Sequence, residues 1–267
     1  MDRNQDIFIT YIPTEWVILL FLIGVGTIYW AINKKIGFQV LYLTLFSMSV
    51  AQIITLHFPY LYTNDELLPF THPQVQIMMT FFSFFIPLCR TRKAIILCLL
   101  PPLLTSVLFI AFGAVPLFSI VGAILIGGFI IYTFYRTLDW IGSMPEPYII
   151  IFAIILPVFL AAIIHPTEKL LIYPGILLGA GIGYTLESFK VRMKIPKPPH
   201  IRGLLASIIG ISGIIVLYGI DRLVYQWVPT TEITIGLVLG LWITLIVPIL
   251  ITAVKLYKTE GHSRIFF

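Results

Sequence analysis

Charged residues are scarce in this sequence, and their scarcity decides the fold class. Only 11% of the 267 residues are Asp, Glu, Lys or Arg, whereas 59% are hydrophobic and the mean hydropathy is +1.01. Soluble domains average about 25% charged residues, so an ordinary soluble fold is excluded. The apolar runs are continuous and do not alternate, which predicts helices rather than a barrel. The predicted fold class is therefore an all-α, polytopic transmembrane helical bundle.

Several chemistries are also missing from the sequence. Cys89 and Cys98 are its only two cysteines, too few for a disulfide framework or a metal site, and we expect them to pack among apolar neighbours. A net charge of +5 is present, but no basic face with interleaved aromatics, so no nucleic-acid partner is expected. Nucleotide-binding glycine loops and HExxH motifs are absent, and we expect no cofactor. Met1 to Pro13 lacks the pattern of a cleaved signal peptide, which predicts that the first helix is retained.

The apolar runs predict about nine membrane spans, each needing roughly 20 apolar residues. The third and sixth are short and are not expected to cross fully. The spans are Thr14–Ile32, Gly37–Leu56, Gln74–Leu88, Ala94–Ala111, Val115–Tyr135, Ile149–Ile164, Leu170–Phe189, Gly203–Ile220 and Ile233–Val254.

Basic residues favour one orientation for these spans, because Lys and Arg prefer cytoplasmic loops. With the N-terminus outside and the C-terminus cytoplasmic, 14 of the 17 Lys and Arg residues fall inside. The remaining three, Arg3, Lys169 and Arg222, fall outside. This asymmetry predicts a multi-pass plasma-membrane protein that contacts membrane lipids and places Phe58–Pro73 on the outer face.

Two framework features stand out within the spans. Gly175, Gly179 and Gly183 are spaced by four, which predicts close helix packing within one subunit, with an oligomer contact as the alternative. Glu187 lies at membrane depth, and its spacing predicts an ion pair with Lys190 one turn later.

The outer loop holds the candidate site. His72 lies at its end, and His57 lies at its start, with Asp65 and Glu66 between them. Two histidines and two carboxylates are able to bind a metal, but the spacing fits no known ligand pattern, so we expect none. A plain structural role for His72, as a helix-start residue bonded to backbone, stays open beside the functional one.

Several segments of the sequence resemble those of a known protein family. A short basic turn follows a Tyr-Trp end in Tyr29–Gly37, and the segments Gly113–Gly127 and Gly179–Arg192 have matching helix layouts. Together they resemble the type 2 phosphatidic acid phosphatase (PAP2) superfamily, in a bacterial branch with extra C-terminal helices. The resemblance covers roughly residues 15–200, which implies a PAP2-like membrane core at 1–200 and additional transmembrane helices at 201–267.

The resemblance implies three motifs that hold phosphate and cleave it. The first, Lys-x6-Arg-Pro, falls on Ala51 and Phe58, with Pro59 retained. The second, Pro-Ser-Gly-His, falls on Pro69-Phe70-Thr71-His72, where Pro69 and His72 match. Gln74 matches a residue common just after this motif. The implied ligand-binding residues are therefore His72, Gln74 and His57.

The third motif, Ser-Arg-x5-His-x3-Asp, is empty. It falls near Leu108-Phe109, Val115 and Ser119, and Gly113 and Gly122 fit its framework. Residues 94–135 contain no His, Lys, Arg, Asp or Glu, so no shift of register supplies a nucleophile.

Three functions follow from these observations. The first is a non-catalytic PAP2-like protein that binds, moves or presents a lipid phosphate at the outer face, or scaffolds a membrane-protein partner. The second is an active polyprenyl pyrophosphate or phosphatidic acid phosphatase that uses rearranged residues around His72. The third is an unrelated transporter, although Glu187 is the one ionisable residue at membrane depth that would serve it.

Overall fold

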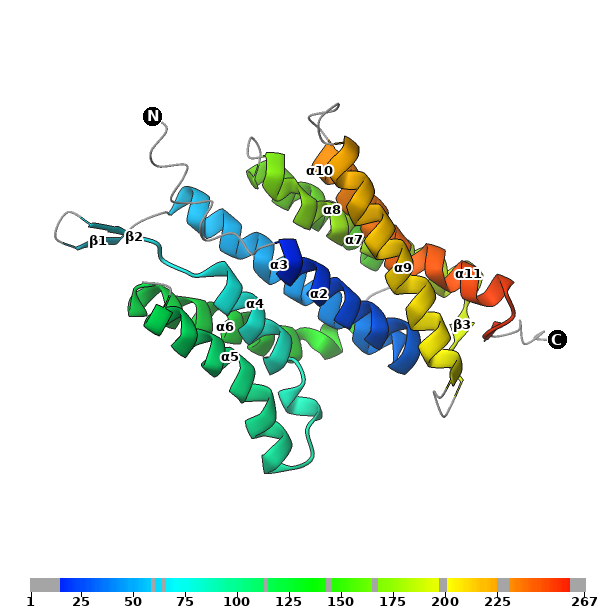
Figure 1. The fold of residues 1–267 in the computed structure, drawn as a ribbon, viewed down its shortest axis with the longest axis horizontal. Coiled ribbons are helices and arrows are strands. Elements are labelled where there is room, and N and C mark those ends of the chain that lie inside the picture. Colours follow the sequence, from blue (N-terminus) through cyan, green and yellow to red (C-terminus); the bar gives the residue numbers. More distant parts are fainter. Residues whose placement is uncertain are drawn as a thin grey trace.

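The computed structural model describes residues 15–58, 61–63, 66–112, 115–142, 146–164, 168–196, 201–224 and 231–259. Helices dominate these residues and pack side by side as a bundle (Figure 1). The predicted all-α membrane bundle is therefore confirmed.

The chain runs through its elements in the following order. They are α2 (Glu15–Thr27), η1 (Ile28–Ile32), α3 (Lys34–His57), β1 (Leu61–Thr63), β2 (Glu66–Leu68), α4 (Pro73–Ser83), η2 (Ile86–Leu88), α5 (Arg92–Phe112), α6 (Leu117–Gly142), α7 (Glu146–Ile164), η3 (Glu168–Leu171), α8 (Ile172–Leu186), η4 (Glu187–Val191), β3 (Met193–Lys194), α9 (Ile201–Val224), α10 (Thr231–Leu241), η5 (Trp242–Ile246), α11 (Val247–Ala253) and β4 (Lys258–Thr259). The turns η1, η4 and η5 are π-helical, and η2 and η3 are 3₁₀ turns.

Each predicted span falls on one helix or on a run of consecutive helical elements. Among the described residues, five helices are long and apolar enough to cross a membrane: Lys34–His57, Arg92–Ala111, Leu117–Thr137, Ile201–Gly219 and Glu232–Ala253. Shorter apolar helices are Ile18–Ile32, Pro73–Leu88 and Ala153–Ile164. The third span is short, as expected, and is broken between α4 and η2, whereas the sixth falls on α7, a helix of 19 residues.

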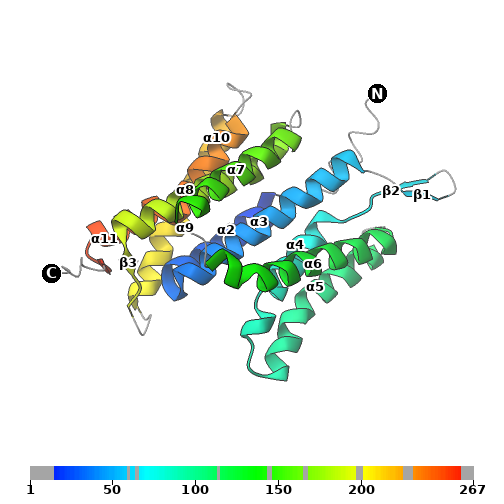
Figure 2. The ribbon, with the colours of Figure 1, turned by 180° about the vertical axis from the view of Figure 1, so that it is seen from behind.

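Helix α3 lies at the centre of the bundle and is the most buried of the long helices. It begins at Asn33, whose side-chain Oδ1 accepts hydrogen bonds from the backbone N–H of Lys35 at 2.9 Å and of Ile36 at 3.2 Å. This capping satisfies two of the N–H groups that a helix start leaves without partners. The elements α4, α5 and α6 lie on one side of α3, and α7 to α11 lie on the other (Figures 1 and 2).

Small residues bring α8 into close contact with α10 and η5. A Cβ added at Gly175 would collide with the Ile233 carbonyl oxygen, one at Gly179 with that of Leu237, and one at Gly183 with Thr244 Oγ1. These contacts lie within a single chain, so the predicted packing role of the three glycines is confirmed.

Three aromatic side chains tie the first helix to the C-terminal helices. Trp30 Nε1 donates to the Ile243 carbonyl at 2.8 Å, and the Tyr29 hydroxyl donates to that of Thr244 at 3.1 Å. The Tyr257 hydroxyl in turn donates to the Trp30 carbonyl at 3.0 Å. Ile243 and Thr244 lie in the π-helical turn η5. A π-turn interrupts the regular hydrogen-bond pattern of an α-helix, which leaves backbone carbonyls available to side-chain donors.

One sequence-based prediction needs correction. Glu187 is fully buried and forms its ion pair with Lys34, 3.2 Å away at the start of α3, rather than with Lys190. A pairing between helices far apart in sequence is invisible to local spacing rules. The Sγ atoms of Cys89 and Cys98 lie 3.7 Å apart, so the two cysteines pack against each other and not only among apolar neighbours.

Candidate functional site

The second-motif segment lies between β2 and α4, at the end of the bundle opposite β3 (Figure 1). His72 precedes the first residue of α4, where Pro73 begins the helix. Its side chain is only 2% exposed, and its ring lies 4.4 Å from that of Phe109 on α5, centroid to centroid. This burial lowers the pKa of the His72 imidazole to about 4. The ring is therefore neutral near pH 7.

The positions assigned to the third motif meet this segment. Phe109, which the resemblance assigns to the family's phosphate-holding Arg, contacts His72 directly. Ser119, which the resemblance assigns to the orienting Asp, donates its hydroxyl hydrogen to the Pro69 carbonyl. The structure thus brings positions of the second and third motifs together, although they are far apart in sequence.

Apolar side chains surround the other position assigned to the third motif. Val115, which the resemblance assigns to the nucleophilic His, is 7% exposed and packs in one cluster with Val75, Ile120 and Ala123. Phe109 and Ile124 close this cluster from the side. A nucleophile needs an activating base and open access to substrate, and Val115 has neither property.

A buried polar network adjoins the motif segment and includes its Thr71. Thr71 Oγ1 donates to Gln76 Oε1 at 2.8 Å, and Gln76 Nε2 donates to the carbonyl and hydroxyl oxygens of Ser47 at 2.8 and 3.1 Å. Ser47 Oγ lies 2.7 Å from Thr80 Oγ1, which donates to the Gln76 carbonyl at 2.9 Å. All four side chains are uncharged and almost fully buried. The network therefore joins α3 and α4 but offers no charge to a phosphate.

Two glycines allow helix α6 to pack closely against this site. A Cβ at Gly122 would collide with the Phe70 carbonyl, and one at Gly127 would lie 3.1 Å from both the Gln76 carbonyl and Thr80 Oγ1. Gly122 was expected to fit the family framework, and its close approach to the second motif gives that fit a physical basis. Gly113 lies outside the described residues.

The other predicted site residues are dispersed. His57 is exposed, and its Nε2 lies 3.1 Å from the Ile163 carbonyl at the end of α7. Gln74 is half-buried in the first turn of α4. Ala51 is buried and Phe58 is 69% exposed. Because neither side chain is charged, neither supplies the cations of the first motif.

No metal site is found in the part of the chain that the structure describes. Within it, no group of three or more His, Cys, Asp or Glu side chains is able to hold an ion. Glu66 lies in β2, and Asp65 and Pro59 lie outside the described residues.

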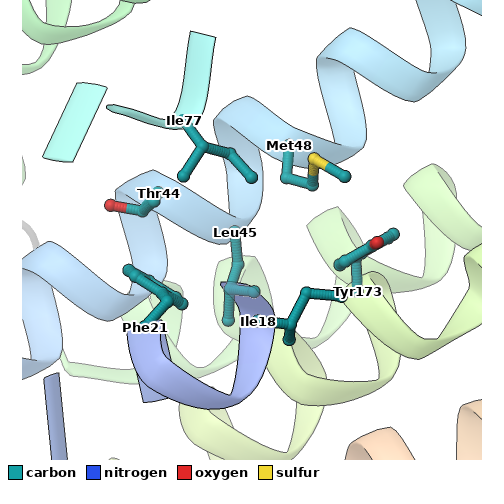
Figure 3. Close-up of a pocket in the computed structure, with 7 residues that line it drawn as sticks. All are labelled: Ile18, Phe21, Thr44, Leu45, Met48, Ile77 and Tyr173. Carbon is teal, nitrogen blue, oxygen red and sulfur yellow. The ribbon is translucent and has the colours of Figure 1, made fainter. Parts of the chain in front are cut away.

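An apolar recess lies elsewhere, between α2, α3, α4 and α8 (Figure 3). Its unfilled space totals about 270 Å³, including the part open to the surroundings. The lining residues are Ile18, Phe21, Thr44, Leu45, Met48, Ile77 and Tyr173. None of these side chains is charged, so the recess does not suit a phosphate.

The network of Thr71, Gln76, Ser47 and Thr80 is not among the features predicted from the sequence. A signal was present, because Gln76 and Thr80 are polar, lie four residues apart and interrupt an apolar run, which places both on one helix face. The partner on α3 carries no comparable signal.

A comparison with protein-family models matches residues 171–259 to the transmembrane extension of the PAP2 superfamily phosphatases. The C-terminal third of this chain is therefore similar to the transmembrane extension of PAP2 phosphatases. The resemblance to the PAP2 superfamily is thereby confirmed, and the match includes Gly179–Arg192, one of the segments that indicated it. No curated protein and no solved structure matches the chain significantly. The PAP2 match begins at the start of α8, beyond the motif segments described above.

Proposed function

We propose that this chain is a non-catalytic PAP2-like membrane protein, in which the phosphatase site has become a packing interface and the bundle serves as a scaffold. One observation carries the proposal. Phe109 and Val115 occupy the positions of the phosphate-holding Arg and the nucleophilic His, and both are packed against other side chains. Loss of a nucleophile alone usually costs several orders of magnitude in rate.

The electrostatics of the outer face support the same proposal. Phosphate is held best by Arg and Lys through charge-assisted hydrogen bonds. Between Lys35 and Arg90 the sequence contains no Lys or Arg, and residues 94–135 contain none either. His72 does not replace them, because burial keeps its imidazole neutral. Scaffolding of a membrane-protein partner therefore fits the site better than binding of a lipid phosphate there.

The chain's ionisable groups also disfavour transport. Coupled transporters use ionisable residues deep in the bundle, where they exchange protons or ions. Glu187 is such a residue, but its carboxylate already contacts Lys34 Nζ and the Met193 N–H. This ion pair joins α3 to η4 and does not line a transport pathway.

The experiment is phosphate release by purified protein from polyprenyl pyrophosphates, phosphatidic acid and phosphatidylglycerol phosphate. His72→Ala serves as the matched variant, and an active PAP2 phosphatase shows that the assay works. We expect the wild-type chain and His72→Ala to release phosphate at the same background rate.

Two outcomes would change the proposal. Release that disappears in His72→Ala would establish an active site rebuilt around His72. A melting temperature that rises with lipid phosphate in the wild type, but not in His72→Ala, would establish an outer-face binder instead of a scaffold.

A further inference from the structure

The end of the bundle opposite the candidate site carries a concentration of cations. Four exposed lysines and a half-buried arginine lie where α8 and α11 end. This group, called the basic surface below, consists of Lys190, Arg192, Lys194, Lys255 and Lys258. In Figure 1, β3 and α11 mark its place at the right of the bundle.

Two segments far apart in sequence are joined to make this surface. β3 pairs with β4 in antiparallel register, so that Met193 faces Thr259 and Lys194 faces Lys258. Like charges directly opposite each other in a ladder are destabilising. The fold nevertheless brings the two lysines together, which concentrates positive charge at one place.

The nearby acid is directed inward, away from the basic surface. Both carboxylate oxygens of Glu187 lie 3.2 Å from Lys34 Nζ, and one accepts the Met193 N–H at 2.8 Å. Residues 188–202 contain no Asp or Glu, and residues 251–267 contain only Glu260. The same two segments contain eight Lys and Arg residues, namely Lys190, Arg192, Lys194, Lys197, Arg202, Lys255, Lys258 and Arg264.

The backbone is also unusual at this surface. Arg192 has a φ of 51° and Lys255 a φ of 59°, and these are the non-glycine residues with positive φ among those that the structure describes. A positive φ at a non-glycine residue costs free energy, and it persists where the surrounding structure holds the backbone in that conformation. Both conformations direct the chain from a helix end into the β3–β4 pair.

Exposed apolar side chains adjoin the cations. Phe189 precedes Lys190 and is 42% exposed, and Val254 precedes Lys255 and is 70% exposed. Cations next to apolar side chains at the ends of membrane helices lie at headgroup depth. This combination distinguishes a lipid from a soluble phosphate, because the apolar side chains are able to contact acyl chains.

We propose that the basic surface binds the phosphate-bearing headgroup of an anionic phospholipid, with its acyl chains along Phe189 and Val254. The inference is independent of whether the outer site is catalytic. It assigns the surface a ligand in addition to any role of its charges in orienting the chain.

The test uses the purified full-length chain in a neutral detergent. Phosphatidylglycerol, phosphatidylcholine of the same acyl chains and soluble glycerol phosphate are titrated separately, and bound lipid is counted by native mass spectrometry. The variant is Lys190→Gln/Lys258→Gln. The control is Arg92→Gln/Lys93→Gln, which removes two exposed cations from the start of α5.

We expect phosphatidylglycerol to bind the wild type in preference to the other two probes. The Lys190→Gln/Lys258→Gln variant should bind it about 30-fold more weakly, since each juxtamembrane cation contributes about one kcal/mol. The control should bind as the wild type does. Raising the salt concentration should weaken binding to the wild type itself, a check that does not depend on any variant.

Several outcomes would overturn the proposal. They are equal binding of phosphatidylglycerol and phosphatidylcholine, an equal loss in the control, and an unchanged affinity in the variant. Binding of glycerol phosphate as tightly as phosphatidylglycerol would show a soluble phosphate site and would overturn the lipid assignment.

Discussion

At the scale of single residues, the candidate site consists of side chains that serve in packing. The resemblance to the PAP2 superfamily assigns Phe109, Val115 and Ser119 to the positions of an Arg, a His and an Asp. Each side chain has an evident structural role: Phe109 contacts the His72 ring, Val115 fills a small cluster, and Ser119 bonds the Pro69 carbonyl. The site is therefore closed by its own residues.

His72 should make stability depend on pH. Its pKa is about 4 in the fold and 6.5 in an unfolded chain, because burial disfavours the imidazolium. Between these values the unfolded state binds the proton and the folded state does not, so the free energy of unfolding falls as the pH drops from about 6.5 to about 4. Melts in detergent across this range should show a steeper fall for the wild type than for His72→Gln. Parallel curves would contradict the burial of the ring.

Gln76 should contribute to stability through its three hydrogen bonds. Gln76→Leu leaves Thr71 and the Ser47 carbonyl without their partner, and we expect a loss of about 1–2 kcal/mol in the free energy of unfolding. Gln52→Leu is the matched control, because Gln52 is equally buried but its hydrogen bond is a weak 3.9 Å contact with Met48 Sδ. Equal losses in reversible unfolding of the two variants would count against the network.

At the scale of elements, close approach depends on glycine. Gly122 lets α6 meet the backbone of the motif segment, and Gly175 and Gly179 let α8 meet α10. Without a strong hydrophobic drive between helices in lipid, such close packing is a main source of association.

Two glycines of α6 should respond oppositely to alanine. Gly122→Ala forces α6 away from the Phe70 carbonyl, and we expect a loss of about 1–3 kcal/mol. Gly128→Ala should be neutral or stabilising by up to about 1 kcal/mol, because its Cβ would meet only Met79 Cε at 3.8 Å. Melting temperatures of the two variants test this difference. A stable Gly122→Ala protein would mean that α6 does not press on the motif segment.

Replacing one partner of the ion pair between α3 and η4 should cost more stability than replacing the other. Lys34→Met leaves the fully buried Glu187 without its cation, and we expect a loss of about 3 kcal/mol. Glu187→Gln should cost less, because Lys34 is 29% exposed and keeps access to solvent. The double variant should cost less than the sum of both single changes. Strict additivity in unfolding experiments would show that the two side chains do not interact.

At the scale of the whole molecule, the sequence predicted the positions of the helices well and their lateral contacts poorly. Lipid requires long continuous apolar helices, so the positions of the spans follow from local composition. The pairing of Glu187 with Lys34 and of Gln76 with Ser47 depends on which helices meet, which composition does not encode. The absence of His, Lys, Arg, Asp and Glu from residues 94–135 is visible in the sequence, but the contact between His72 and Phe109 was not predictable from it.

The arrangement of the bundle is consistent with the orientation proposed from the basic residues. The β1–β2 pair and the basic surface lie at opposite ends of the bundle (Figures 1 and 2). A cysteine introduced at exposed Lys258, in a chain whose Cys89 and Cys98 are replaced by Ser, should therefore be protected from an impermeant thiol reagent in intact cells. Labelling of this cysteine before lysis would contradict a cytoplasmic C-terminal end.

The most direct test of the central claim is phosphate release from phosphatidic acid by the wild-type chain, measured beside His72→Ala over prolonged incubation. A site filled by Phe109 and Val115 predicts the same background release for both proteins. Release by the wild type that is abolished in His72→Ala would contradict the account and show that catalysis persists around His72.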